Sequence, residues 1–513
     1  KSFRYIQKPR RVYPISKLRS PETRFYELRL PILYHTKTHL FGVIQAQNMS
    51  GLTVVSAPGK ALVAGGYLVL HSAYKSLVVA LSARIYAVLQ PSSGPQSSIF
   101  TVIVKSPQFK DAQWVYTCSL GDDSSVTIEQ TSGVTKNAFA QQAIEHVFAY
   151  LSPFKSSDLT ISIYADNEYY SRAVPQGEDA YTYRKSLPQF SPLDHTLSQV
   201  NKTGLGSSAA LITSLTGALL THFNDSINLE SNQGKRIINN CAQLAHCAAQ
   251  GKIGSGFDVA AATYGSCVYS TSSRSNFPSS REMNGQEFAD QVKLMVNSTW
   301  DSEIESISLP RGVRVVMADV DAGSETPSMV RKVLAWKAEA RDMAETLWTN
   351  LGESNSRLIK AFEKLTQAIG ESPIDYDQSV KEISEGKSVT NIPFCHLFDE
   401  IRRHFQNNRR YLRTIGELSG TPIEPPEQTS LLDVCGQING VLGCGVPGAG
   451  GLDAIFAVIL EETTAENELH TLWNDWKDTN VSPLTAEGIS TGIKSEDSEM
   501  FDTLWDYFDE ESA

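Results

Sequence analysis

The segment NKTGLGSSAALITSLTGALL, residues 201–220, constrains the fold more than any other part of the 513-residue chain. Glycines and serines crowd its first half, and a run of good helix formers follows at once. Leu211, Leu215 and Leu219 recur every four residues, which predicts a helix with one face in a hydrophobic core. The segment therefore predicts a glycine turn that leads directly into a core helix.

The start of this helix is suited to bind an anion. Gly204 and Gly206 allow positive φ angles and a close approach of the backbone. Ser207 and Ser208 fall in the first turn, where backbone N–H groups lack intrahelical partners and the helix dipole favours negative charge. Lys202 adds a positive charge beside them. A plain serine-capped helix after a glycine turn explains the same residues, so the segment alone leaves both interpretations open.

Two common nucleotide-binding glycine motifs are excluded. The P-loop requires G-x-x-x-x-G-K-[ST], and the Gly-Lys pairs at 59–60 and 251–252 lack the preceding glycine. GCGVPG at 443–448 matches G-x-G-x-x-G, but the strand-like run DAIFAVIL follows it where the motif needs a helix. The sequence therefore predicts neither a P-loop protein nor a Rossmann protein.

Length and charge set the domain organisation that we expect. A chain of 513 residues can bury two or three cores, and its net charge of −12 argues against a wide nucleic-acid surface. Residues 1–48 carry ten Lys and Arg against two Glu, and eight Asp and Glu with no base follow Lys494. We expect a basic extension outside the fold at 1–48, domains at 49–310 and 311–480, and an acidic, solvated tail at 481–513.

Cysteine usage and hydropathy favour a cytoplasmic protein. The seven cysteines lack the short paired spacing of a zinc site or a redox motif, so we expect reduced packing thiols. No apolar run reaches the roughly 18 residues that a membrane span needs. The first segment is basic, as a mitochondrial transit peptide would be, but it contains four prolines and no clear amphipathic repeat.

Hydrophobic periodicity predicts alternating strands and helices. Strands are expected at 76–90, 98–106, 158–166 and 312–320, and helices at 136–151, 231–250, 325–347, 351–369 and 394–418. Residues 52–70 predict short strands broken by Pro-Gly and Gly-Gly turns. Residues 167–194 and 271–310 lack a clear period and are predicted to be irregular loops.

Three glycine loops resemble, in order, the three motifs of the GHMP kinases, the superfamily of galactokinase, homoserine kinase, mevalonate kinase and phosphomevalonate kinase. The first glycine loop is SAPGKALVAGGYLVL (56–70), the second is KTGLGSSAAL (202–211) and the third is GVPGAGGLDAI (445–455). Two further strings, at 245–266 and 423–433, resemble the fungal phosphomevalonate kinases. The resemblance implies an α+β fold of two domains with the active site in the cleft between them.

The resemblance also implies a reaction and its residues. The reaction is phosphoryl transfer from ATP, with Mg²⁺, to 5-phosphomevalonate, giving 5-diphosphomevalonate in the mevalonate route to isoprenoids and sterols. Asp258 matches the catalytic aspartate, and Lys60 is expected to point into the cleft. The ATP phosphates are expected on Lys202, Thr203, Gly204, Leu205, Gly206, Ser207, Ser208 and Ala209, with Ser207 or Ser208 near the metal. The acceptor is expected on Lys60, Lys202, Lys252, Ser324, Gly448, Ala449 and Gly450.

A phosphate acceptor changes what the catalytic residues must do. A phosphate monoester has a second pKa near 6, so the attacking oxygen is already largely anionic at pH 7. Bringing two polyanions together then needs positive charge more than it needs a base. We therefore expect Asp258 chiefly to position Lys60 and the acceptor.

Departures from the family pattern bear on the choice of substrate. Mevalonate kinases carry a glutamate eleven residues before the catalytic aspartate, where this chain has Cys247 beside His246. We expect His246 to pack or to form hydrogen bonds rather than to bind metal. Val200 and Asn201 replace the proline that usually leads the second motif, and Pro447 stands where bacterial relatives show serine. Mevalonate kinase, diphosphomevalonate decarboxylase and a non-catalytic ligand sensor are the alternatives, and the oligomeric state is left open.

Overall fold

The computed structural model describes residues 51–123, 125–272, 283, 285–320, 326–387 and 392–501. These residues fall into one compact unit. The predicted extension at 1–48, the candidate Ser324 and residues 502–513 lie outside the described residues. The expectations for those segments therefore stay predictions.

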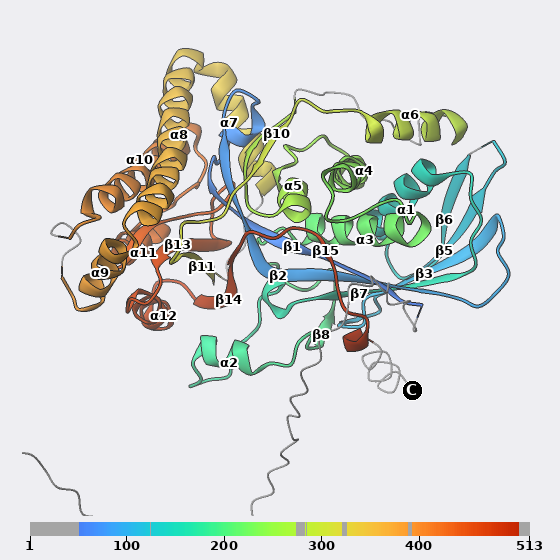
Figure 1. The fold of residues 1–513 in the computed structure, drawn as a ribbon, viewed down its shortest axis with the longest axis horizontal. Helices are drawn as coiled ribbons and strands as arrows, with labels where there is room; N and C mark the ends of the chain where they lie inside the picture. Colours follow the sequence, from blue (N-terminus) through green and yellow to red (C-terminus); the bar gives the residue numbers. More distant parts are fainter. Residues whose placement is uncertain are drawn as a thin grey trace, which may run out of the picture. The chain divides into compact units, whose positions relative to one another are not determined.

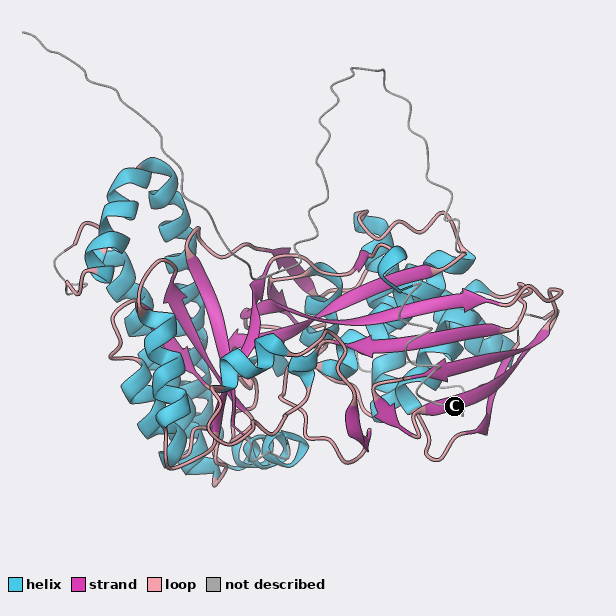
Figure 2. Cartoon of the chain, turned by 90° about the horizontal axis from the view of Figure 1, so that it is seen from below, coloured by secondary structure: helices cyan, strands magenta, loops and turns pink. Residues whose placement is uncertain are grey.

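One mixed sheet joins the two halves of the described chain (Figure 1, Figure 2). Its strand order is β12-β13-β11-β14-β2-β7-β3-β5-β6, and β1 and β9 also pair with β2. The strands are β1 (Thr53–Ala64), β2 (Ser76–Pro91), β3 (Ile99–Lys105), β4 (Phe109–Lys110), β5 (Gln113–Leu120), β6 (Val126–Ser132), β7 (Leu159–Ala165), β8 (Leu193–Thr196), β9 (Cys267–Ser270), β10 (Glu303–Ser306), β11 (Val313–Val320), β12 (Val441–Gly445), β13 (Ala454–Leu460), β14 (Val481–Ile489) and β15 (Lys494–Ser495). Because β14 pairs with both β11 and β2, the sheet is continuous across the domain boundary predicted near residue 310, which stays a prediction.

Helices cover the sheet in two groups, one over each half of the chain (Figure 1). The first group is α1 (Ala138–Leu151), α2 (Ala180–Ser186), α3 (Ser207–Phe223), α4 (Asn232–Gln250), α5 (Phe257–Tyr264) and α6 (Gly285–Asn297), with the 3₁₀ turns η1 (Leu68–Leu70) and η2 (Asn167–Tyr169). The second group is α7 (Thr326–Glu339), α8 (Arg341–Glu371), α9 (Pro373–Ser384), α10 (Cys395–Ser419), α11 (Pro426–Cys435) and α12 (Ala465–Asp475). In the first group, α3 packs on β1 and β2 and is flanked by α1 and α4.

Local sequence explains the elements that were predicted and found. In α3, Leu215 and Leu219 are fully buried, as the leucine stripe predicted. The helix α4 begins after Ser231, whose hydroxyl accepts a hydrogen bond from the N–H of Gly234, and it ends at Gly251 with φ 66°. All seven cysteines are free thiols, which agrees with the predicted reduced set. Among the residues that the structure describes, no helix is both long and apolar enough to cross a membrane.

The prediction of a turn at Pro58-Gly59 is wrong. The strand β1 continues through this pair, and its register with β2 shifts between the two residues. Such a bulge accommodates a proline, which has no N–H to give to the ladder. The first glycine loop is therefore a bulged strand as far as Ala64, and its turn comes only at Gly65, where φ is 116°.

Two segments predicted to be loops contain regular structure. Residues 271–310 include α6 and β10, and β10 pairs with β9. Residues 167–194 include η2, α2 and the start of β8. The break between the two helices expected at 325–369 falls at Ala340 rather than near residue 350. The helix α6 buries Phe288, Val292 and Val296, four residues apart, so its period was present in the sequence and was overlooked. The short elements α2 and β8 gain their stability from tertiary packing.

The predicted acidic tail is also corrected in its first part. Residues 481–489 form β14 inside the sheet, and β15 pairs with β1. Phe501 is fully buried against the rings of Tyr86, Tyr164 and Phe190. The abundance of acidic residues after Lys494 concealed this packing, because only a few apolar residues of the segment carry it.

Candidate active site

The three glycine loops meet at Lys60. The backbone N–H of Lys60 donates to the Leu205 carbonyl at 2.9 Å, and its Nζ donates to the Gly204 carbonyl at 2.8 Å. The first loop also reaches the third, because the Tyr67 hydroxyl donates to the Ala449 carbonyl at 2.8 Å. Segments almost 400 residues apart in the sequence are thus held together by hydrogen bonds that end on main-chain carbonyls.

The second glycine loop presents an open helix N-terminus. Gly206 is the N-cap of α3 with φ 82°, and it has no side chain to bond the first-turn N–H groups. Ser207 and Ser208 are the first two helical residues, so neither is the cap. The interpretation of a plain serine-capped helix is therefore wrong, and the N–H groups of the first turn are available to an anion.

The same loop is anchored to the body of the fold by Thr203. Its hydroxyl donates to the Glu168 carbonyl at 2.7 Å, and its N–H donates to the Tyr169 carbonyl at 3.2 Å. The Glu168 carboxylate in turn accepts from the N–H and the hydroxyl of Thr485, at 3.1 and 2.7 Å. The side chains of Thr203, Leu205 and Ala209 are buried, so these three predicted nucleotide ligands have only main-chain groups to offer.

The electrostatics of Lys60 depend on two carboxylates. Burial lowers its pKa from the ordinary lysine value, and Asp258 and, more weakly, Asp453 oppose that shift. Its Nζ lies 5.8 Å from the centre of the Phe257 ring. A methyl group on Gly206 would lie 3.0 Å from Lys60 Cε, so the glycine leaves room for the lysine stem. Lys60 is therefore held as a partly desolvated cation between the loops.

Asp258 lies in the first turn of α5, after the N-cap Gly256. Its Oδ1 accepts from the N–H of Val259 at 3.0 Å, and its Oδ2 lies 4.0 Å from His246 Nε2. His246 Nε2 also lies 3.2 Å from the Ser208 hydroxyl, which agrees with a hydrogen-bonding role for this histidine. In the described part of the chain, no group of three or more His, Cys, Asp or Glu side chains could hold a metal ion.

Lys202 lies at the rim of a cavity beside the second glycine loop. The cavity is bounded by three aromatic rings, those of Trp114, Phe139 and Tyr170, and by Ser207 and Ser208 of α3. Lys202 pairs through its backbone with Tyr170, and partial burial lowers the pKa of its ammonium group. The cavity has a volume of about 70 Å³, below the roughly 300 Å³ of the smallest ligand pockets, so it marks an aromatic recess beside the second glycine loop rather than a formed ligand pocket.

Lys252 lies farther from the meeting point of the loops. It is exposed in the turn after α4, where its N–H donates to the Cys247 carbonyl at 3.2 Å. Lys252 and Asp258 both influence the pKa of the Cys247 thiol, which burial raises to about 11. Within the described residues, no hydrogen bond or ion pair joins the Lys252 side chain to a glycine loop.

The third glycine loop is shaped by residues 421–428. Gly448 and Gly450 have φ angles of 66° and 77°. The N–H of Gly451 donates to the Ile423 carbonyl at 2.8 Å, and a methyl group on Gly450 would collide with that same oxygen. Gln428 Nε2 donates to the Gly451 carbonyl at 3.3 Å. The backbone of the third loop is therefore fixed by its contacts with residues 421–428.

Sequence reasoning missed Asp453. It lies at the end of the third glycine loop, near Lys60, and its Cβ is 3.7 Å from the place that a Cβ on Gly204 would take. The signal was present, because Asp453 belongs to the string GVPGAGGLDAI that carries the family resemblance. The proximity of Asp453 to Gly204 in the second loop could not be predicted from the sequence.

Comparisons with known proteins agree with this geometry. The family profile described as "GHMP kinases N terminal domain" matches residues 179–266, and that described as "GHMP kinases C terminal" matches residues 396–477. The chain is 36% identical to the phosphomevalonate kinase of Gibberella zeae over 470 residues, covering 87% of this chain and 97% of the relative. It is 35% identical to the phosphomevalonate kinase of Aspergillus fumigatus over 464 residues, covering 83% and 91%.

A solved structure shows the same fold at lower identity. The Streptococcus pneumoniae phosphomevalonate kinase in complex with phosphomevalonate and AMPPNP has a TM-score of 0.54 and 14% identity, covering 85% of this chain and 99% of that one. The two profiles and the three glycine loops define a GHMP kinase of the α+β class. Because its relatives match along nearly their whole length, the chain belongs to the phosphomevalonate kinase family.

Proposed function

We propose that the protein is a phosphomevalonate kinase. It transfers the γ-phosphoryl group of ATP to (R)-5-phosphomevalonate and releases 5-diphosphomevalonate and ADP, a step in the mevalonate pathway to isoprenoids and sterols. The observation that carries the proposal is the position of the Lys60 ammonium, 2.8 Å from the Gly204 carbonyl where the glycine loops meet. The fungal relatives that cover most of the chain support the choice of acceptor.

The nucleotide would lie along the second glycine loop. Its phosphates would accept hydrogen bonds from the open N–H groups at the start of α3, where the helix dipole also favours negative charge. The nucleoside would lie beside Trp114, Phe139 and Tyr170, whose cavity of about 70 Å³ would have to widen to admit a base. Lys202, at the rim of that cavity, adds positive charge on the side of the phosphates.

Magnesium would be held in this site mainly by the nucleotide phosphates, and not by a cluster of protein carboxylates. Magnesium usually keeps several waters and binds one or two protein oxygens together with substrate phosphates. The Ser208 hydroxyl already bonds to His246, whereas no hydrogen bond of the Ser207 hydroxyl is found in the described residues. Ser207 is therefore the better ligand of the two, and the ion would supply charge neutralisation between the two polyanions.

Lys60 and Asp258 would act by charge and position. Lys60 would offset the negative charge shared by the donor and the acceptor phosphates. Asp258 opposes the fall in the Lys60 pKa, so it keeps the lysine protonated and oriented. The acceptor phosphate needs no strong base, because its second pKa lies near 6.

The acceptor would lie between Lys60 and the third glycine loop. Gly448, Ala449 and Gly450 would contact it through their main chain, although the Ala449 carbonyl is already bonded to Tyr67. Lys202 and Lys252 would attract its charge, Lys252 from the edge of the site. Ser324 belongs to the same proposal and lies outside the described residues. The proposed partners are this acceptor and ATP alone, with no nucleic acid, and the proposed location is the cytoplasm.

Parallel assays of ADP release would test the proposal. The enzyme with ATP and Mg²⁺ is given mevalonate, 5-phosphomevalonate or 5-diphosphomevalonate, and turnover is expected with 5-phosphomevalonate alone. Turnover with mevalonate alone would make the protein a mevalonate kinase, and release of CO₂ from 5-diphosphomevalonate would make it a decarboxylase. Binding without turnover of any acceptor would make it a ligand sensor.

A second experiment tests the role of the two side chains. Lys60→Met is expected to lower kcat by roughly a thousandfold, about 4 kcal/mol of transition-state stabilisation. Asp258→Asn should cost less at every pH. If its loss of rate disappears once the acceptor is fully dianionic, Asp258 is a general base and the positioning role is wrong.

A further inference from the structure

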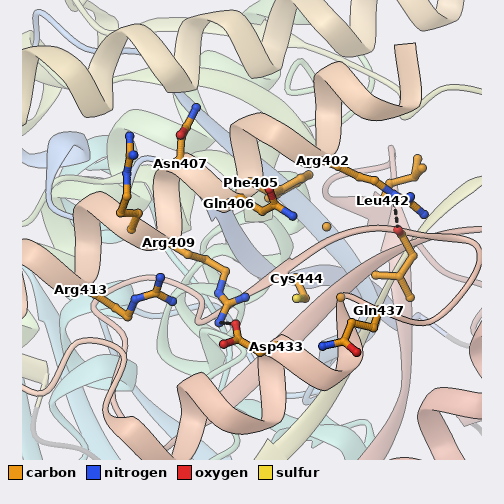
Figure 3. Close-up of a pocket in the computed structure, with 14 residues that line it drawn as sticks. Arg402, Phe405, Gln406, Asn407, Arg409, Arg413, Asp433, Gln437, Leu442 and Cys444 are labelled. Carbon is orange, nitrogen blue, oxygen red and sulfur yellow. Dashed lines mark hydrogen bonds and ion pairs between the residues drawn. The ribbon is translucent and has the colours of Figure 1, made fainter. Parts of the chain in front are cut away.

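A second cavity lies behind the third glycine loop, between α10, the end of α11 and the edge strand β12 (Figure 3). Its volume is about 520 Å³, within the range of small-molecule sites. Its β12 wall is Val441–Cys444, which ends where the third loop begins. None of the residues assigned above to ATP or to the acceptor lines this cavity.

The wall formed by α10 is strongly basic. Residues 402–413 contain five arginines and no acid, in a chain whose net charge is −12. Four of these arginines line the cavity, namely Arg402, Arg409, Arg410 and Arg413. Their spacing of seven, one and three residues keeps them along one side of the helix. Charge of one sign is therefore concentrated on a single concave surface.

The acids near this wall leave positive charge unbalanced. Glu424, whose side chain is fully buried, bonds Arg409 at 2.6 Å and Arg413 at 2.9 Å. Asp433 contacts Arg409 at 2.9 Å across the cavity, but its side chain is 56% exposed and can turn into solvent (Figure 3). Within the described residues, the hydrogen bond found for the Arg402 side chain is to the Val441 carbonyl, at 3.0 Å, and Asp399 is the acid whose charge acts on it. In the described residues, no ion pair of Arg410 is found.

We propose that this cavity binds an anion with two or more phosphate groups. Arg402 and Arg409 are two helical turns apart, or about 10 Å along the helix, and they are held by different partners, the Val441 carbonyl and Glu424. A chain of phosphates can contact both where they stand, whereas a single phosphate group would have to draw the two side chains together. The planar guanidinium fork matches phosphate oxygens in pairs. An entering phosphate would replace the Asp433 carboxylate on Arg409.

This site is linked to the third glycine loop. Arg409 and Arg413 hold the Glu424 carboxylate, and the adjacent Ile423 carbonyl accepts from the N–H of Gly451. An anion that binds Arg409 and Arg413 therefore acts on residues 421–428, the segment that shapes the third glycine loop. We expect it to change the KM for the acceptor more than the KM for ATP.

Calorimetric titration of the full chain with inorganic tripolyphosphate tests the site. Two binding events are expected, and Gly206→Ala should weaken only the one at the second glycine loop. Arg410→Gln should weaken the other event roughly tenfold, as for the loss of one charge-assisted hydrogen bond. Arg403→Gln is the matched control, because Arg403 is an exposed arginine of the same helix that does not line the cavity. Asp433→Asn should tighten binding severalfold by removing the competing carboxylate.

The outcomes separate this proposal from the proposed function. A single binding event that Arg410→Gln and Arg403→Gln affect equally would overturn the cavity site, whatever the acceptor assays show. Equal affinity for orthophosphate, pyrophosphate and tripolyphosphate would overturn the requirement for several phosphates. If an organic diphosphate binds here more tightly than inorganic pyrophosphate, the organic group also contacts the cavity, which adds to the proposal.

Discussion

The second and third glycine loops use the same residue type for different purposes. The second loop turns into α3, so its glycines expose the N–H groups and the positive end of a helix. The third loop connects β12 to β13, two antiparallel neighbours in the sheet, and has no helix dipole to offer. The first arrangement presents the positive end of a helix, whereas the second, a connection between two strands, presents no such dipole.

The two loops are also anchored differently. Thr203 fixes the second loop to η2, which lies in the same half of the chain. The third loop depends on segments from elsewhere, Tyr67 in front and Ile423 behind, and Ile423 is held through the buried pair of Glu424 and Arg409. The direct anchor of the second loop therefore lies within about 40 residues of it in the chain, whereas the third loop is held by residues from both halves of the chain.

Among the variants that test this difference in anchoring, the loss of the Glu424 carboxylate should have the largest effect. Glu424→Gln leaves Arg409 buried without its main partner, and we expect a loss of about 3 kcal/mol in the free energy of unfolding. Glu168→Gln should cost less, about 1–2 kcal/mol, because the Thr485 hydrogen bonds can partly re-form to the amide and because the buried Arg184, 3.8 Å from Glu168, keeps Asp319 at 3.9 Å. Urea denaturation measures both, with the exposed Glu417→Gln as the control. Equal losses for Glu168 and Glu424 would remove the distinction between the two anchors.

Glycine substitutions in the third loop should show whether its close contact with the Ile423 carbonyl matters for activity. Gly450→Ala and Gly448→Ala impose the same strain of positive φ, but only the first brings a methyl group against the Ile423 carbonyl. We expect kcat/KM for the acceptor to fall roughly a hundredfold in Gly450→Ala and no more than tenfold in Gly448→Ala. Similar losses in both variants would mean that backbone strain, and not the contact, governs the loop.

A smaller effect is expected in the second loop. Gly206→Ala places a methyl group 3.0 Å from Lys60 Cε, and the flexible lysine stem can move aside. We expect the KM for ATP to rise roughly tenfold, since Lys60 and the start of α3 both shift. Gly251→Ala is the control, because φ there is also positive but the methyl group would meet nothing within 4 Å. An unchanged KM for ATP in Gly206→Ala would show that the loop tolerates a side chain.

The smallest effect is on pH dependence. Because the pKa of Lys60 is lowered, activity that needs its charge should fall at a lower alkaline pH than an ordinary lysine would give. The contribution of Lys60 to stability changes in the opposite direction. Because its pKa is lower in the folded state, the free energy of unfolding rises as pH rises between the folded-state and unfolded-state pKa values. Asp258→Asn should move the alkaline limb of kcat to lower pH, and Asp453→Asn should move it less. A limb that moves upward in either variant would contradict the assigned charges.

The sequence predicted the local parts of the site well. The helix α3 and its glycine turn follow from residues within a few positions of one another. It failed where packing between distant segments decides the structure, as in β14, whose strand in the middle of the sheet was assigned to a solvated tail. Short strands gain their stability from neighbours that may lie hundreds of residues away.

By itself, the sequence determined the helix α3 and the glycine turn before it, because hydrophobic period and glycine geometry are local properties, and its three glycine loops carried the resemblance that implied the α+β fold. Only the tertiary structure decided that Gly206 rather than a serine caps α3, that Asp453 lies beside Lys60, and that Glu424 supports the third loop from behind. The last two contacts join residues between 15 and almost 400 positions apart. Their distances are set by how the sheet and helices pack, which no local pattern records.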